Sequence, residues 1–134
     1  MPKGNKAFTV VELMVAVGII AIIASIIIPN MFMARRTANE AAAKTNLRSI
    51  ASAAETLYAS KSHYPNNLNE FQNYMQSINS FCADLSGTQT EYKGYRYSCT
   101  SDVGNYTLVA SPAIVGSTGS VTYTATTGGI LTPL

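Results

Sequence analysis

The chain has 134 residues, of which 47% are hydrophobic and 12% are charged, and its formal net charge is +2. This length suits one modest domain, and the hydrophobic content excludes a disordered polyelectrolyte. The small net charge argues against a nucleic-acid-binding protein with a basic patch. Lys3 and Lys6 account for the whole excess, because without them the chain carries seven basic and seven acidic side chains.

An apolar run from Phe8 to Ile28 follows these two lysines. At about 1.5 Å per residue, a helix of this length crosses a hydrocarbon core of about 30 Å. A cleaved secretory signal has a shorter apolar region followed by small residues, so we expect a membrane helix that is retained. Basic residues lie on both sides of the run, with Arg35 and Arg36 after it, and they leave its orientation open.

Glu12 is the one charged residue in this run. Placing a carboxylate inside hydrocarbon is costly, and two interpretations follow. Glu12 lies at the membrane interface and favours a helix N-terminus, or it has a function that requires a charge in apolar surroundings. The residues alone do not decide between them.

The sequence becomes amphipathic after Pro29. Apolar residues then recur at spacings of three and four, which predicts one helical face packed against a globular part. The residues of this face are Leu47, Ile50, Ala54, Leu57 and Tyr58. We expect one helix from Thr9 to about Lys61, ended by the pair Tyr64-Pro65.

Two residues weaken this long helix. Pro29 has no amide hydrogen and clashes with the preceding turn, and Gly18 has low helix propensity. We therefore expect the helix to bend between Gly18 and Pro29.

The C-terminal half has the signals of a short helix and a small sheet. Asn67 and Glu70 resemble a capping box, which predicts a helix from about Leu68 to Ser80. Three alternating runs follow at residues 91–99, 105–111 and 120–126, with a fourth strand expected near 129–132. The predicted fold is α+β, with the long helix packed on an antiparallel meander.

Cys82 and Cys99 both fall in this half, with no histidine beside them. Two cysteines without further ligands make a poor metal site. If this half lies outside the cytoplasm, a disulfide is the better interpretation, and two buried free thiols are the alternative. The sequence has no nucleophile–base arrangement, phosphate loop or ligand cluster, and His63 stands alone. We therefore expect neither an enzyme nor a cofactor.

The segment KAFTVVELMVAVGIIAIIASIIIPNMFMARR resembles the N-terminus of type IV pilins and pseudopilins. In that family a short basic leader precedes a Phe, a Glu follows four places later, and an apolar helix contains a Pro near its end. The matching residues are Lys3, Lys6, Phe8, Thr9, Glu12 and Pro29. Ala7 departs from the family, which usually has Gly immediately before the Phe.

The resemblance implies a maturation route and a domain organisation. A prepilin peptidase would cut between Ala7 and Phe8 and methylate the new amine of Phe8. Residues 1–7 would be a leader, 8–29 a transmembrane and filament-core helix, 30–61 an amphipathic helix, and 62–134 a connecting loop and β-sheet head. The subunit would wait in the inner membrane with its head in the periplasm, until an assembly platform and an ATPase motor extract it into a filament.

The resemblance also implies roles for single residues. Glu12 would pair with the Phe8 amine of a neighbouring copy and direct assembly. The helix would bend or extend between Gly18 and Pro29 in the filament. A disulfide between Cys82 and Cys99 would bound the C-terminal region of the head, as in pilins.

Several functions remain open at this point. A major type IV pilin is preferred, because a major type II secretion pseudopilin typically binds calcium in an acidic C-terminal loop and lacks a disulfide. A minor pilin and a secretion pseudopilin are the alternatives within the same machinery. An anchor with one membrane helix and a periplasmic domain that never polymerises is an alternative from another class. Electron transfer along aromatic rings is disfavoured, because Phe8, Phe32 and Tyr58 are far apart on the helix.

Overall fold

The computed structural model describes residues 7–134, and the predicted α+β class is confirmed. The chain divides into two compact units, one ending at Ala34 and the other formed by Arg35–Leu134. We call the second unit the head. Lys3, Lys6 and the rest of the predicted leader before Ala7 lie outside the described residues.

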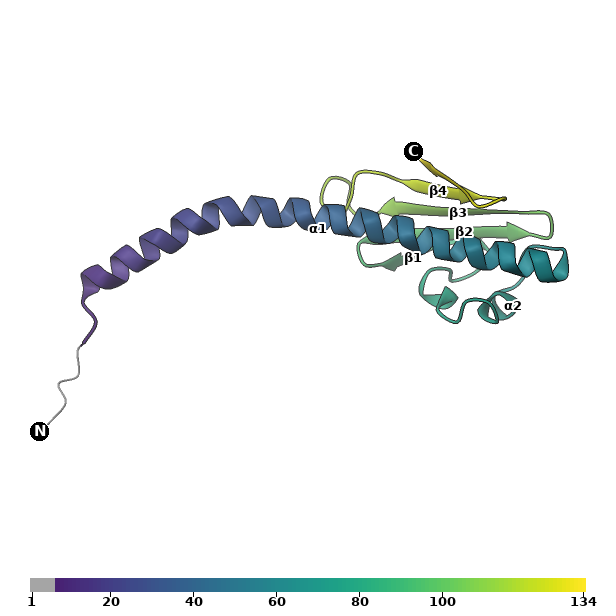
Figure 1. The fold of residues 1–134 in the computed structure, drawn as a ribbon, viewed down its shortest axis with the longest axis horizontal. Helices are drawn as coiled ribbons and strands as arrows, with labels where there is room; N and C mark the ends of the chain where they lie inside the picture. Colours follow the sequence, from purple (N-terminus) through teal and green to yellow (C-terminus); the bar gives the residue numbers. More distant parts are fainter. Residues whose placement is uncertain (1–6) are drawn as a thin grey trace, which may run out of the picture. The chain divides into compact units, whose positions relative to one another are not determined.

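One helix, α1 (Val10–Lys61), contributes to both units (Figure 1). Most of its residues in the first unit are apolar and exposed, whereas in the head apolar residues along one face of the helix are buried. The helix ends at Lys61, and Ser62 then adopts a positive φ of 62°. The end of the helix therefore lies just before Tyr64-Pro65, as expected from the restriction that proline places on the residue before it.

The buried face of α1 supplies seven of the nineteen buried hydrophobic residues of the head. Its buried residues are Ala43, Leu47, Ile50, Ala51, Ala53, Ala54 and Leu57. Tyr58 was predicted to share this face, and that prediction is wrong, because its side chain is 44% exposed. Its ring instead stacks on that of Tyr64, with centroids 4.5 Å apart, and so covers the edge of the core.

The connection after α1 holds two short helical segments in place of the single helix predicted over 68–80. These are α2 (Leu68–Gln72) and the 3-10 turn η1 (Ile78–Ser80). Asn67 caps α2 as predicted, because its Oδ1 accepts a hydrogen bond of 2.8 Å from the amide of Glu70. Phe71 and Ile78, two of the apolar residues with helical spacing, are both buried in the core. They belong to two separate helical segments, α2 and η1.

Five antiparallel strands form one sheet in the order β1-β2-β3-β4-β5, and α1 lies across one face of it (Figure 1). The strands are β1 (Ser86–Tyr92), β2 (Tyr95–Asp102), β3 (Asn105–Pro112), β4 (Tyr123–Thr126) and β5 (Ile130–Pro133). The run 91–99 was predicted as one strand and is instead a hairpin. Lys93 and Gly94 form its turn with φ of 48° and 81°, the left-handed values that a two-residue hairpin turn requires.

Alternate residues of β2, β3 and β4 face the helix and complete the core. They are Tyr95, Tyr97 and Cys99 in β2, Tyr106, Leu108 and Ala110 in β3, and Ala125 in β4. The predicted shared face of Tyr106, Leu108 and Ala110 is therefore confirmed. Cys99 forms a disulfide with Cys82, with Cα atoms 5.5 Å apart, which ties the connection after η1 to the central sheet.

Candidate functional site

The segment before α1 presents an exposed, non-helical stretch of backbone. Ala7, Phe8 and Thr9 precede the first helical residue, Val10, and Phe8 is 81% exposed. A peptide bond in such a position is open to an enzyme, because it takes part in no helical turn. The structure therefore leaves the predicted cleavage position, between Ala7 and Phe8, outside the helix.

Thr9 and Glu12 form a reciprocal cap at the start of α1. The amide and hydroxyl of Thr9 donate to Glu12 Oε2 at 2.9 and 2.8 Å, and the amide of Glu12 donates to Thr9 Oγ1 at 3.2 Å. This pattern is a capping box, in which each side chain satisfies an amide that the helix leaves free. Thr-x-x-Glu is visible in the sequence, but sequence reasoning did not recognise it as a cap.

The first unit exposes a continuous apolar helical surface. An 18-residue window of α1 has a mean hydropathy of 2.8, and none of that window is buried within the structure. Among the described residues, α1 is one helix that is long and apolar enough to cross a membrane. An apolar surface of this extent marks a membrane or protein contact, because water does not favour it.

Gly18 and Pro29 lie on this surface within unbroken helix. Pro29 cannot donate a backbone hydrogen bond to the carbonyl one turn earlier, at Ser25. The Ser25 hydroxyl adds a local contact by donating to the carbonyl of Ile22 at 2.7 Å. A Cβ atom at Gly18 would meet nothing within 4 Å, so close packing inside the subunit does not require glycine there.

The predicted site residues therefore fall into separate groups. Ala7, Phe8 and Glu12 lie together at the start of α1, and Gly18 and Pro29 follow along the same helix. Cys82 and Cys99 belong to the core of the head, where both are buried. Among residues 7–134, no group of three or more His, Cys, Asp or Glu side chains lies close enough to hold a metal.

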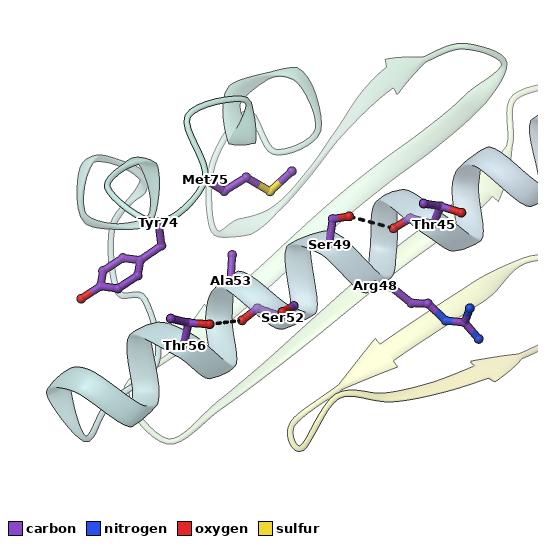
Figure 2. A pocket seen from close by; sticks show the side chains of 8 residues that line it. All are labelled: Thr45, Arg48, Ser49, Ser52, Ala53, Thr56, Tyr74 and Met75. Atoms are coloured by element: carbon purple, nitrogen blue, oxygen red, sulfur yellow. Dashed lines mark hydrogen bonds between the residues drawn. The ribbon is translucent and has the colours of Figure 1, made fainter.

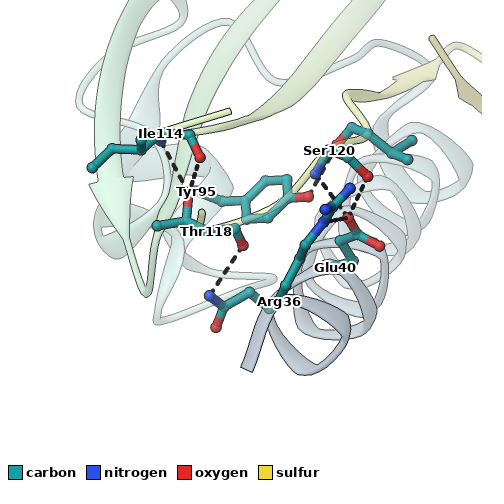
Figure 3. A network of polar contacts seen from close by, with 8 residues as sticks. Arg36, Glu40, Tyr95, Ile114, Thr118 and Ser120 are labelled. Carbon is teal, nitrogen blue, oxygen red and sulfur yellow. Dashed lines mark hydrogen bonds and ion pairs between the residues drawn. The ribbon is translucent and has the colours of Figure 1, made fainter. Parts of the chain in front are cut away.

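Two carboxylates of α1 that sequence reasoning missed organise the head. Glu40 Oε1 accepts hydrogen bonds of 2.8 Å from both the amide and the hydroxyl of Ser120, and it also pairs with Arg36 at 3.5 Å (Figure 3). The bonds from Ser120 lower the pKa of Glu40. This carboxylate anchors the loop between β3 and β4 to the helix.

Glu55 is the second of these carboxylates. Its Oε1 accepts from the Tyr106 hydroxyl at 2.9 Å and from the Gly128 amide at 2.8 Å, and its Oε2 accepts from the Tyr64 hydroxyl at 3.2 Å. Burial is the main cause of the raised pKa of Tyr106, and the neighbouring carboxylate raises it further. No local motif marks Glu55, because Tyr106 and Gly128 lie 51 and 73 positions further along the chain.

An open groove of about 530 Å³ lies in the head between α1 and the segment that contains Tyr74 and Met75 (Figure 2). Its helical wall carries small hydroxyl side chains, and Tyr74 and Met75 form the opposite wall. The hydroxyls of Thr45, Ser49 and Thr56 each donate to the carbonyl four residues earlier. These three hydroxyl hydrogens are therefore already used within the helix.

The start of the chain matches a known motif. Residues 2–28 match the family model described as the prokaryotic N-terminal methylation motif. This match covers Ala7, Phe8, Glu12 and Gly18, and it confirms the resemblance that the same segment carries.

Two characterised proteins are similar to this chain over part of its length. The type IV major pilin protein PilA of Myxococcus xanthus is 38% identical over 66 residues, which is 49% of this chain and 30% of that protein. The type IV wide pilus major component PilA4 of Thermus thermophilus is 45% identical over 38 residues, 28% of this chain and 29% of that protein. The matches thus span less than a third of the length of either relative.

Proposed function

We propose that this chain is a structural subunit of a type IV pilus, the major pilin, which polymerises after its leader is removed. The observation that carries the proposal is the methylation motif over residues 2–28, together with the similarity to two major pilus components. The pilin-like α+β architecture supports it. A subunit of this kind acts by assembly, and an enzymatic activity is no part of the proposal.

Maturation begins at the exposed bond between Ala7 and Phe8. A prepilin peptidase hydrolyses this bond and a methyl group is added to the new amine of Phe8. Ala7 has a small side chain and is compatible with a peptidase that normally meets Gly. Removal of the leader takes Lys3 and Lys6 with it, and the mature subunit is then electrically balanced.

The apolar half of α1 first anchors the subunit in the inner membrane and later forms the filament core. Its large side chains, such as Ile22 at 66% and Met33 at 69% exposure, need a cover of lipid or protein. Copies of the same helix provide that cover when a membrane platform and an ATPase motor assemble the subunits. The head lies in the periplasm before assembly and on the surface of an extracellular filament afterwards.

Glu12 directs this assembly by pairing with the methylated amine of Phe8 in a neighbouring copy. A charge that is buried in an apolar core is strongly unfavourable unless an opposite charge neutralises it, so the pair selects one stagger of the subunits. In the free subunit, the carboxylate is held by Thr9. Assembly therefore exchanges a cap within one chain for an ion pair between two.

The stretch of α1 between Gly18 and Pro29 is the part of the helix that can change conformation. The missing donor at Pro29 leaves this region with one hydrogen bond fewer than a regular helix. We propose that the helix bends or extends between these residues when the subunit enters the filament. Loss of helical density between Gly18 and Pro29 in a filament reconstruction is the expected result, and continuous density would contradict it.

The main experiment identifies the mature N-terminus and the main component of surface fibres. Mass spectrometry of sheared fibres is expected to find this chain as the principal protein, beginning at a methylated Phe8. An intact Met1 on a chain that stays in the membrane fraction would instead indicate the non-polymerising anchor. A processed chain present only in trace amounts would indicate a minor pilin or a secretion pseudopilin.

Substitutions at the cap separate the two roles of Glu12. Glu12→Gln keeps an oxygen that can accept from Thr9 but removes the charge, and it is expected to abolish most filaments. Thr9→Ala removes the cap and keeps the charge, and it is expected to leave filaments largely intact. If Glu12→Gln assembles normally while Thr9→Ala does not, Glu12 acts only as a cap.

A further inference from the structure

The head has two distinct ends along its helix (Figure 1). At one end, the Asn39 amide group donates a hydrogen bond of 3.1 Å to the carbonyl of Thr118, which places the β3–β4 loop beside the first turns of the head helix. At the other end, the amide of Tyr64 donates to the carbonyl of Val103 at 3.1 Å, which places the β2–β3 turn beside the last turn. The strands between them run along the helix.

The charged side chains are divided between these ends. The first end carries four basic residues, Arg35, Arg36, Lys93 and Arg96, and two acidic ones, Glu40 and Glu91. Both of these acids already face arginines, at 3.5 Å for Arg36–Glu40 and 3.9 Å for Arg96–Glu91. Arg35 and Lys93 therefore leave this end with a positive charge, and we call it the basic end.

The opposite end carries an excess of carboxylates. Its acidic residues are Glu55, Glu70, Asp84 and Asp102. Lys61 balances one of them through a 2.7 Å contact with Glu70. A hydrogen bond from the Thr88 hydroxyl and two from backbone amides hold the pKa of Asp84 well below its usual range, so it stays charged. We call this the acidic end.

Each end also exposes large apolar side chains. Ile114 and Val115, in the β3–β4 loop of the basic end, are 62% and 78% exposed. This loop is held rigidly, because the amide of Gly116 donates to the carbonyl of Gly119 at 2.7 Å and Thr118 bonds to both the amide and the carbonyl of Ile114. At the acidic end, Val103 and Ile130 are also more than half exposed.

We propose that the two ends are complementary surfaces through which the head of a second copy of this chain packs end to end, the basic end of one copy against the acidic end of the next. The two ends carry opposite charges, and each exposes apolar side chains that the other end can cover. A second copy therefore accounts for both surfaces. A contact between two different surfaces of identical subunits propagates from copy to copy, and it builds an open filament when its rotation does not close into a ring. The inference rests on the proposed function and adds which surfaces of the head meet.

A membrane surface is the competing occupant, since Arg35, Lys93 and the Val115 loop would suit anionic lipid. Lipid accounts for the basic end alone and leaves the acidic end unexplained. The second copy accounts for both.

A charge exchange in the full chain, expressed in its own host, tests the proposal by the yield of sheared filaments. Lys93→Glu and Asp102→Lys are each expected to lower the yield by about fivefold, the upper range for an exposed charge pair. The double variant restores the opposite charges and is expected to return to within about twofold of the unmodified chain. Arg48→Glu combined with Asp102→Lys is the matched control, because Arg48 lies on the groove midway between the ends, and it should not recover.

The outcomes separate this inference from the proposed function. If the unmodified chain forms no filaments, both fail. If it forms filaments and either single variant matches its yield, or the double variant stays low, the end-to-end contact is wrong while the pilin function stands. A loss in Lys93→Glu alone, with no recovery by Asp102→Lys, would point to lipid at the basic end and overturn the proposal. Asp102→Lys also loses a hydrogen bond to the amide of Val103, but a folding defect of that origin would not be rescued by Lys93→Glu.

Discussion

The hydroxyl of Tyr106, in β3, donates a hydrogen bond of 2.9 Å to the carboxylate of Glu55, in α1. The same carboxylate accepts the amide of Gly128, in the turn between β4 and β5. One side chain of the helix thus joins a central strand and the C-terminal hairpin. The helix and sheet are held together by this polar contact as well as by their apolar core.

Replacing Glu55 with Ala is expected to destabilise the head by about 1–3 kcal/mol, the range for leaving a buried partner without its acceptor. Tyr106 is only 2% exposed, so water does not readily replace the lost carboxylate. Urea unfolding followed by circular dichroism measures the change. Thr56→Ala is the control, since Thr56 is exposed and is expected to alter stability by less than about 0.5 kcal/mol. Equal effects in the two variants would contradict the role of Glu55.

Removal of the disulfide is expected to cost about 3 kcal/mol, because a bridge that closes a loop of this size restricts the unfolded chain. Cys82 and Cys99 are 17 positions apart and both buried, so Cys82→Ala with Cys99→Ala is the suitable variant. Its thermal midpoint is compared with that of the oxidised parent. A reducing agent should lower the midpoint of the parent and leave the variant unchanged. A parent insensitive to reduction would show that the bridge does not stabilise the head.

Gly119→Ala is expected to displace the β3–β4 loop. A Cβ atom at this position would lie 2.2 Å from the hydroxyl oxygen of Tyr95, which is itself buried and hydrogen-bonded to the carbonyl of Val121. We expect a loss of about 1–3 kcal/mol in the free energy of unfolding, as for overpacking in a core. Gly104→Ala, where nothing lies within 4 Å, should be nearly neutral. Similar midpoints for the two variants would mean that the loop yields without cost.

Alkaline pH is expected to weaken the head. Burial raises the pKa of Tyr95 to about 12, above the ordinary value of 10.0. The raised pKa favours the neutral folded form, so this contribution is fully present below pH 10 and is lost as the pH rises from 10 towards 12. The free energy of unfolding is measured across this window, with phenolate absorbance as a direct probe. Tyr95→Phe should show a shallower decline, and an identical slope would rule out Tyr95 as the cause.

Much of the fold is predictable from local sequence. The 3.6-residue spacing of Leu47, Ile50, Ala54 and Leu57 marks the buried helical face, because only one face of α1 meets the sheet. Alternation in β3 marks its buried side in the same way. A disulfide was the preferred interpretation of the two cysteines if this half lies outside the cytoplasm, and the structure contains the bridge.

The errors occur where non-local packing decides. Lys93-Gly94 is a weaker turn signal than Asn-Gly, so the hairpin between β1 and β2 was read as one strand. Tyr58 has the spacing of a core residue, but its ring stacks on the outside of the buried Tyr64 and stays 44% exposed. Phe71 and Ile78 have helical spacing, yet both reach the core without a continuous helix between them.

In the candidate site, too, the local motifs could be predicted from the sequence and the non-local contacts could not. The motif around Phe8 and Glu12 is contiguous and can be read directly, although the cap that Thr9 and Glu12 form was not recognised. Glu40 and Glu55 have no such local sign, because their partners Ser120 and Gly128 lie 80 and 73 positions away. Sequence periodicity places these acids on the helix but cannot show what reaches them.

The meander has a consequence for how the chain folds. Each strand pairs only with its neighbours in sequence, so the hairpins can form quickly and locally, as in proteins of low contact order. The bonds of Glu40 and Glu55 to Ser120 and Gly128 close only when the last fifteen residues arrive. Until those residues are in place, the head helix lacks these two contacts to the sheet. Residues 120–134 therefore complete the polar contacts between the sheet and the head helix.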